Sequence, residues 1–254
     1  MNGEILEVVY SFDGLQPADA WSQVWRWLST SGACAGPLFY NDKELDGGTI
    51  ARVLLKSKAN HFRIDGAAYV IDFCQIRNYD CCLLQIQSHA QQAISSWREA
   101  VPLLISDTFI SARLADREYE YWQNAEDPLQ YEAAVRSYEN LPLISNGLPY
   151  PLEKQVIDIR QNPGRRILRN GFVEAVGAAM WLGNLFFERV RCKPGHLTKV
   201  LGSKALTQLA CGVVAVMGGE KCFTQPDGEE GRVQQFLRQA IYGVSHGEQT
   251  YQEA

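Results

Sequence analysis

Residues 67–87 read AAYVIDFCQIRNYDCCLLQIQ, and no other stretch indicates the type of fold as strongly. It contains two runs rich in apolar and β-branched residues, 67–76 and 81–87, which only the segment RNYD separates. A connection this short suffices for antiparallel strands but not for the crossover that parallel strands require. The stretch therefore predicts an antiparallel hairpin.

Further strand candidates lie on both sides of this hairpin. The segment 4–12, EILEVVYSF, predicts an opening strand. The apolar run 101–105 predicts a third strand of the same sheet, and 206–217 predicts another strand near the C-terminus. We therefore expect an α+β fold with a mainly antiparallel sheet and a few flanking helices.

Helices are predicted between and after these strands. The first begins near Pro17 and has an apolar stripe that leaves Trp27 outside it. The members of the stripe are Trp21, Val24, Trp25 and Leu28. A second helix is expected at 49–56 with Thr49 as its cap, and a last helix at 229–242.

The chain of 254 residues is expected to form a single domain, residues 1–254, with a flexible tail at 243–254. The segment 145–151, SNGLPYP, is rich in turn residues and is the candidate internal boundary. Glu4 and Glu7 interrupt the N-terminal segment, which lacks the apolar run of a signal peptide. Since no stretch reaches the ~18 uninterrupted apolar residues of a membrane span, we expect a cytoplasmic protein.

Several motifs of catalytic and metal-binding proteins are missing. The sequence has neither a G-x-x-x-x-G-K-[ST] nor a G-x-G-x-x-G phosphate loop, and its four histidines form no H-E-x-x-H pair. Its seven cysteines form no C-x-x-C pair. Cys81 and Cys82 should point to opposite faces of their strand, one buried and one at an edge. We expect no metal, no cofactor and no catalytic residue; a hydrolase or nuclease site assembled from residues distant in sequence is the alternative.

Charge is distributed unevenly along a chain whose net charge is −5. Residues 107–153, the acidic belt, contain three basic and nine acidic side chains, whereas residues 154–204, the basic belt, contain ten and three. The two belts either pair with each other across the folded surface or serve partners of opposite charge. The arginines at 160–169 would suit phosphate groups, but the acidic chain argues against direct nucleic-acid binding.

The acidic belt is densest at 116–132. Six carboxylates lie there within 17 residues: Asp116, Glu118, Glu120, Glu126, Asp127 and Glu132. We expect a strand that ends near Trp122 and carries residues 116, 118 and 120 on one face, followed by a helix at 129–139 that Asp127 caps. Such a face suits a magnesium-dependent nuclease, a solvated surface, or a mimic of nucleic-acid phosphates that binds a basic groove. The nuclease is the least favoured, because 107–153 contains no lysine.

Three segments read YEYWQNAEDPLQY (119–131), SNGLPYP (145–151) and EAVGAAMWLG (174–183). In these segments the chain resembles the immunity protein 52 family of bacterial polymorphic toxin systems. The resemblance implies a non-enzymatic antidote that is encoded beside a toxin and binds it directly. The toxins of that family include nucleases with a restriction-endonuclease-like fold that are delivered by type VI secretion.

The sequence therefore predicts an immunity protein that binds a cognate toxin, a DNase of a type VI secretion system, and occludes its active site. Aromatic side chains would anchor the interface and carboxylates would steer the partner. The predicted partner-binding residues are Asp116, Glu118, Tyr119, Glu120, Tyr121, Trp122, Glu126, Asp127 and Glu132. A scaffold or adaptor is a third hypothesis, and the sequence leaves the oligomeric state open.

Overall fold

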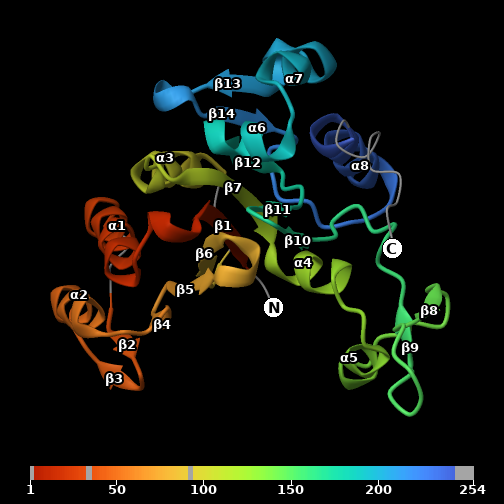
Figure 1. Ribbon diagram of the computed structural model, residues 1–254, viewed down its shortest axis with the longest axis horizontal. Helices are drawn as coiled ribbons and strands as arrows, with labels where there is room; N and C mark the ends of the chain where they lie inside the picture. The colour runs from red at the N-terminus through yellow and green to blue at the C-terminus, as the bar shows by residue number, and fades with distance from the viewer. Residues whose placement is uncertain (1–2, 33–35, 91–93, 244–254) are drawn as a thin grey trace.

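A ten-stranded antiparallel sheet forms the centre of the computed structural model, which describes residues 3–32, 36–90 and 94–243 (Figure 1). The strand order is β13-β14-β12-β7-β1-β6-β5-β4-β2-β3, and every neighbouring pair is antiparallel. The strands are β1 (Glu4–Ser11), β2 (Leu38–Tyr40), β3 (Lys43–Glu44), β4 (His61–Gly66), β5 (Tyr69–Ile76), β6 (Cys81–Ser88), β7 (Phe109–Asp116), β12 (Ala179–Leu182), β13 (Leu206–Gln208) and β14 (Val214–Met217). The α+β fold with a mainly antiparallel sheet is confirmed.

Helices and two small hairpins surround this sheet. The helices are α1 (Pro17–Thr30), α2 (Gly47–Lys56), α3 (Ile94–Leu104), α4 (Arg117–Gln123), α5 (Pro128–Ala133), α6 (Asn184–Val190), α7 (Pro194–Leu201) and α8 (Gly228–Tyr242). The hairpins pair β8 (Leu143–Ser145) with β9 (Gln155–Ile157), and β10 (Ile167–Arg169) with β11 (Phe172–Glu174). In the part of the chain that is described, no helix has the length and apolar character to cross a bilayer.

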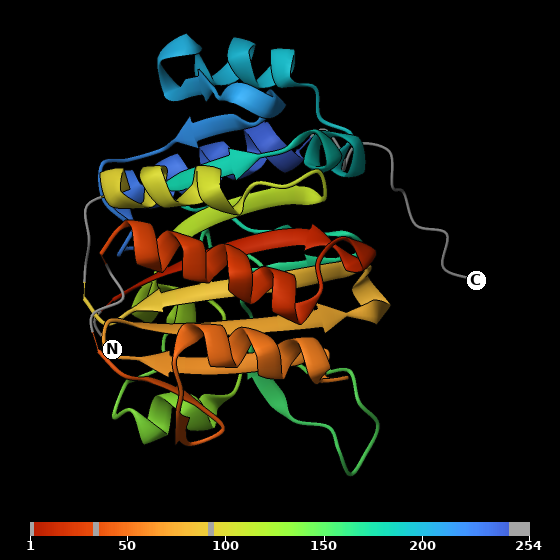
Figure 2. The same ribbon diagram turned by 90° about the vertical axis from the view of Figure 1, so that its left-hand side faces the viewer.

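The first face of the sheet is covered by α1, α2 and α3, which lie in front of its strands in Figure 2. Aromatic rings fill this layer: Trp27 of α1 packs 5.1 Å from Tyr69 and 5.9 Å from Trp97 between ring centroids. The Tyr10 hydroxyl of β1 donates a hydrogen bond of 2.7 Å to the carbonyl of Leu104 in α3. The core of this face is therefore largely aromatic, and the buried Tyr10 hydroxyl has a partner within it.

The second face is covered by α4, the β10–β11 hairpin and α8 (Figure 1). As a result β7 is buried along its whole length, and β1 is buried from Glu4 to Tyr10. Strands buried on both faces are normally apolar throughout. Here Glu7 and Arg113, which are cross-strand partners, are charged exceptions in the middle of the sheet.

A buried charge network surrounds Glu7. Its carboxylate accepts hydrogen bonds from Arg113 Nε at 3.0 Å, Arg166 Nε at 2.9 Å and Gln85 Nε2 at 3.0 Å. Arg113 also donates to Glu120 of α4, at 2.8 Å from one of its terminal nitrogens. Burial acts to raise the pKa of Glu7, but the Arg113 and Arg166 guanidinium groups outweigh it and lower the pKa from 4.5 to about 2. The network ties α4 and the segment around Arg166 to the two central strands.

A second network fixes the β10–β11 hairpin and α8. Glu174 of β11 is buried and accepts hydrogen bonds of 2.8 Å from both Arg169 and Arg238. Arg238 also donates to the carbonyl of Arg165. Two arginines of the basic belt, Arg166 and Arg169, are thus paired with buried carboxylates of the fold. Lys154 does pair with the acidic belt, since its ammonium group lies 3.0 Å from the Asp127 carboxylate.

Several expected elements are confirmed. The hairpin predicted at 67–87 is β5–β6, the opening strand is β1, and the first and last predicted helices are α1 and α8. The candidate boundary at 145–151 lies in the turn region between β8 and β9. The tail expected at 243–254 lies outside the described residues, apart from Gly243.

Two predicted strands are wrong. The apolar run 101–105 belongs largely to α3, in which four fully buried residues recur at helical spacing: Trp97, Ala100, Val101 and Leu104. The run 206–217 is interrupted at Cys211 and Gly212, whose φ angles are +69° and +78°. The chain reverses there, so two short antiparallel strands, β13 and β14, replace one long strand.

Two helices differ from the predictions at their ends. The helix expected at 49–56 begins at Gly47, and Asp46 rather than Thr49 is its cap. The aspartate caps it because its carboxylate accepts hydrogen bonds from both the amide and the hydroxyl of Thr49, at 2.9 Å and 2.5 Å. The helix predicted at 129–139 is too long. It ends at Ala133, and Val135 adopts a φ of +54°, which a right-handed helix does not allow.

Two predictions about burial are wrong as well. Trp27 is buried and Trp25 is only half-buried, because Trp97 of α3 and Tyr69 of β5 contact α1 from the side and widen its buried face beyond one stripe. Cys81 and Cys82 are both fully buried, since β6 lies between β1 and β5 inside the sheet. Neither of the two thiols lies at an edge.

We expect Glu7→Gln to destabilise the protein by about 3–5 kcal/mol, because it leaves Arg113 buried without its full countercharge. The carboxylate of Glu7 contributes stability above its ordinary pKa of 4.5, and this contribution is lost as the pH falls through about 2. Urea unfolding between pH 5 and pH 2 should therefore show a smaller loss of stability in the variant than in the parent. Glu99→Gln, at an exposed position of α3, is the matched control. Equal pH dependence in the parent and Glu7→Gln would contradict the role of the network.

Candidate functional site

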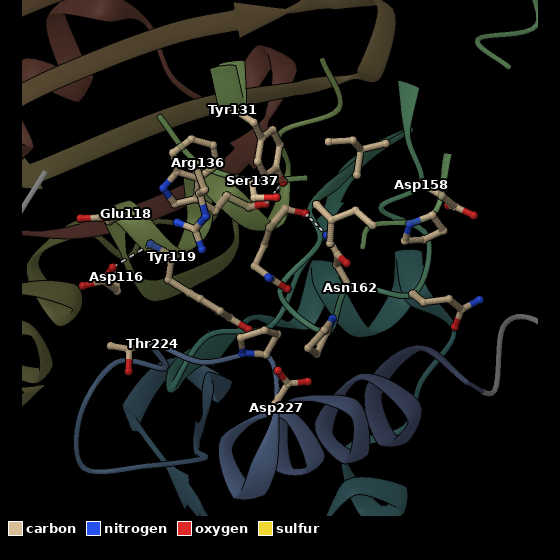
Figure 3. Close-up of a pocket in the computed structure, with 18 of the residues that line it drawn as sticks. Asp116, Glu118, Tyr119, Tyr131, Arg136, Ser137, Asp158, Asn162, Thr224 and Asp227 are labelled. Carbon is tan, nitrogen blue, oxygen red and sulfur yellow. Dashed lines mark hydrogen bonds between the residues drawn. The ribbon is translucent and has the colours of Figure 1, made fainter. Parts of the chain in front are cut away.

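A cleft of about 650 Å³ lies beside the second face of the sheet (Figure 3). Its walls come from α4, α5, the segment 136–142, the loop 157–163 and the start of α8 with the residues before it. The cleft therefore joins parts of the acidic belt to segments that are far away in sequence. It contains four of the predicted partner-binding residues.

Carboxylates surround the cleft. Figure 3 shows Asp116 and Glu118 on one side, Asp158 on the opposite side and Asp227 below. The hydrogen bonds of Arg160 to Asp158 lower the pKa of that carboxyl to about 2. Among the described lining residues, the only Lys or Arg side chain is that of Arg136. Because Arg160 offsets the charge of Asp158, the excess of negative charge around the cleft comes from Asp116, Glu118 and Asp227.

Aromatic side chains form one wall. The rings of Trp122 and Tyr131 lie 4.8 Å apart between centroids, and Tyr121 packs against Trp122 at 4.9 Å. The Arg136 guanidinium carbon lies 4.6 Å from the centroid of the Trp122 ring. A guanidinium over an indole face is a favourable cation–π contact. The guanidinium of Arg136 thus covers part of the aromatic wall.

Local interactions fix α4 in this position. Asp116 ends β7 and caps α4, because its carboxylate accepts a hydrogen bond of 2.8 Å from the Tyr119 amide. The Tyr119 hydroxyl donates to Gln234 of α8 at 3.0 Å, and burial raises the pKa of this hydroxyl. Together with the pairing of Glu120 and Arg113, these contacts connect α4 to the sheet and to α8.

The loop at 162–166 is held against α4 by three hydrogen bonds. Gln123 accepts from the Gly164 amide at 3.0 Å through its side chain and from Asn162 Nδ2 at 2.9 Å through its carbonyl. Asn124 accepts from the Arg166 amide at 2.6 Å. This part of the cleft is therefore built from directed bonds between two segments that the sequence separates widely.

The structure separates the predicted partner-binding residues into three groups. Asp116, Glu118, Tyr119 and Trp122 line the cleft. Tyr121, Glu126 and Glu132 are exposed outside its lining. Glu120 and Asp127 have structural partners, since Glu120 bonds Arg113 and Asp127 caps α5 and bonds Lys154 at 3.0 Å.

The expected strand with a single face of carboxylates is wrong. The strand β7 ends at Asp116, and Glu118 and Glu120 belong to helix α4, so they point in different directions. The reason is the helix cap. The Asp116 carboxylate accepts a hydrogen bond from the Tyr119 amide in the first turn of α4, whereas in a strand this amide would bond to a neighbouring strand. The sequence also gave no indication of Arg136, Asp158 and Asp227, because nothing local shows that these residues meet across the cleft.

No group of three or more His, Cys, Asp or Glu side chains gathers in a metal-binding arrangement among the residues that the structure covers. One catalytic spacing does occur in the sequence: residues 243–247 read GVSHG, which matches G-x-S-x-G. Serine hydrolases place this motif after a strand. Here it follows helix α8, and residues 244–247 lie outside the described part of the chain.

No protein-family model and no curated protein matches this chain. Its structure is similar to that of the Pseudomonas aeruginosa T6SS protein PA0821, with a TM-score of 0.58 and 10% sequence identity. The likeness covers 95% of this chain and 73% of that protein. At this identity the likeness shows a common fold.

We expect Asp116→Ala to lower the free energy of unfolding by about 1 kcal/mol, because α4 loses its cap. Asp116→Ser keeps an oxygen that can accept from the Tyr119 amide and should recover most of that stability. The midpoint of urea unfolding measures both variants. Equal midpoints for the parent and Asp116→Ala would show that Asp116 does not fix α4.

Proposed function

We propose that this chain is a cytoplasmic immunity protein that binds a cognate toxin, a DNase of a type VI secretion system, and covers its active site. The observation that carries the proposal is the cleft, in which carboxylates surround an aromatic wall. A DNase must hold a phosphate backbone and therefore presents basic side chains around its active site. A rigid acidic and aromatic surface complements such a groove.

The charge of the cleft supports a rapid encounter. Opposite surface charges steer two proteins together and raise the association rate constant at low salt. The aromatic wall supports a long-lived complex, because buried aromatic side chains dominate many interfaces.

Two similarities agree with this proposal. The fold is shared with a T6SS protein at 10% identity. The segments 119–131, 145–151 and 174–183 resemble the immunity protein 52 family. The first of these segments contributes Tyr119, Trp122 and Tyr131 to the cleft.

The proposal is tested first by binding and protection. The protein encoded by the adjacent open reading frame is purified and titrated against this chain, and the two are co-expressed in a growth assay. We expect a stable complex at moderate salt and rescue of growth. Failure of either would contradict the immunity function.

The enzymatic alternative has its own readout. The purified chain is incubated with DNA and Mg²⁺ or Mn²⁺, and separately with a generic ester substrate. We expect no turnover in either assay. Cleavage of DNA by the chain alone would favour a nuclease, and ester hydrolysis that Ser245→Ala abolishes would favour a serine hydrolase built on the G-x-S-x-G spacing.

Charge reversal tests the cleft itself. We expect Glu118→Lys with Asp227→Lys to lower the association rate constant at low salt by about tenfold and to weaken its salt dependence. Stopped-flow mixing with the same partner gives both quantities. The matched control is Asp19→Lys with Glu99→Lys, which reverses two exposed carboxylates on α1 and α3, across the sheet from the cleft. If both double variants associate equally fast, the cleft does not steer the partner.

A further inference from the structure

Exposed apolar side chains concentrate in one part of the molecule. Of the fifteen large apolar residues found exposed in the described chain, seven lie between Leu129 and Leu152. Three of them occupy alternate positions in the loop between β8 and β9: Leu148 is 50%, Tyr150 91% and Leu152 65% exposed. In Figures 1 and 2 this hairpin extends away from the large sheet. Apolar groups gathered in this way on a water-exposed surface are typical of an interaction site.

The loop that carries these side chains is internally braced. The Asn146 side chain accepts from the Leu148 and Lys154 amides, both at 3.2 Å, and donates to the Leu152 carbonyl at 3.0 Å. The Leu152 amide donates to the Pro149 carbonyl at 2.9 Å. One asparagine thus bonds both sides of the loop. A loop held in its binding conformation loses little entropy when it binds.

We propose that the loop 146–154 is a preformed binding element that inserts Leu148, Tyr150 and Leu152 into an apolar pocket of the toxin. This inference rests on the proposed function and adds a second contact surface to it. The cleft supplies charge, whereas the loop supplies apolar area. Neither Leu148 nor Tyr150 belongs to the residues that line the cleft.

The charge around the loop indicates what borders the pocket. Glu126, Glu132 and Glu139 are exposed on the neighbouring segments, and Glu153 lies in the loop itself. The ammonium group of Lys154 is paired with an aspartate, Asp127, at 3.0 Å. An apolar tip among carboxylates fits an apolar pocket bordered by basic side chains. A nucleic-acid enzyme has such side chains beside its substrate groove.

The loop and the cleft are parts of one continuous surface. Leu141, Pro142, Ile157 and Asp158 lie at the base of the β8–β9 hairpin and line the cleft. The Asp158 amide donates to the Pro142 carbonyl at 2.8 Å and closes this base. A stable interface needs about 800 Å² on each partner, more than three side chains provide. A partner that engages the loop therefore also reaches the cleft.

The experiment compares three variants for binding to the purified product of the adjacent open reading frame. The double variant Leu148→Ser with Tyr150→Ser removes apolar area from the tip, and we expect it to bind about 30-fold more weakly or worse, through faster dissociation. Asn146→Ala keeps every apolar side chain but loses the bracing, and should bind about tenfold more weakly. Leu55→Ser, at a 77% exposed leucine of α2, is the matched control and should bind like the parent.

The outcomes separate this inference from the proposed function. If the parent fails to bind, the proposed function and the loop inference both fail. If the parent binds and the double variant binds equally well, only the loop inference fails. Circular dichroism and urea unfolding show that each variant is folded. Sedimentation of the protein alone tests a second copy as the occupant: a dimer that the double variant dissolves would overturn the assignment to the toxin.

Discussion

One buried carboxylate and two guanidinium groups hold the second layer of this protein to its sheet. Glu7 lies between Arg113, its cross-strand neighbour, and Arg166 from a distant loop. If the loop left the sheet, the buried Glu7 carboxylate would lose Arg166, and if α4 left, the buried Arg113 guanidinium would lose Glu120. Each change would leave a buried charge with fewer partners, which is costly. These ion pairs therefore hold the loop and α4 against the sheet, whereas α8 packs through apolar residues such as Leu237 and Ile241.

The cleft follows from that arrangement. Arg113 binds Glu120 of α4, and Arg166 belongs to the loop that Gln123 binds. The Tyr119 hydroxyl then reaches α8. The site is thus supported by groups behind its surface, which keep its carboxylates and aromatic rings in fixed positions. In the proposed complex, long-range charge sets how fast the toxin arrives, and the aromatic wall and apolar loop set how long it stays.

Local sequence patterns were sufficient for much of the fold. The β5–β6 hairpin needed only two apolar runs and a short connection. The cap of α5 at Asp127 also followed from a local signal. The sequence also showed that residues 116–132 are rich in acidic and aromatic side chains, because composition does not depend on tertiary contacts.

Other features depend on contacts between distant residues. Asp116 caps a helix instead of extending a strand. Glu120 binds Arg113 inside the protein and does not face a partner protein. Asp158 and Asp227 join the cleft from separate segments. The spacing of apolar residues, the turn residues and the clusters of charge are properties of residues close together in the sequence, so they could be recognised without a structure. Which charges are buried in pairs and which surround a cleft is a property of the folded chain alone, because it depends on which strands and loops pack together.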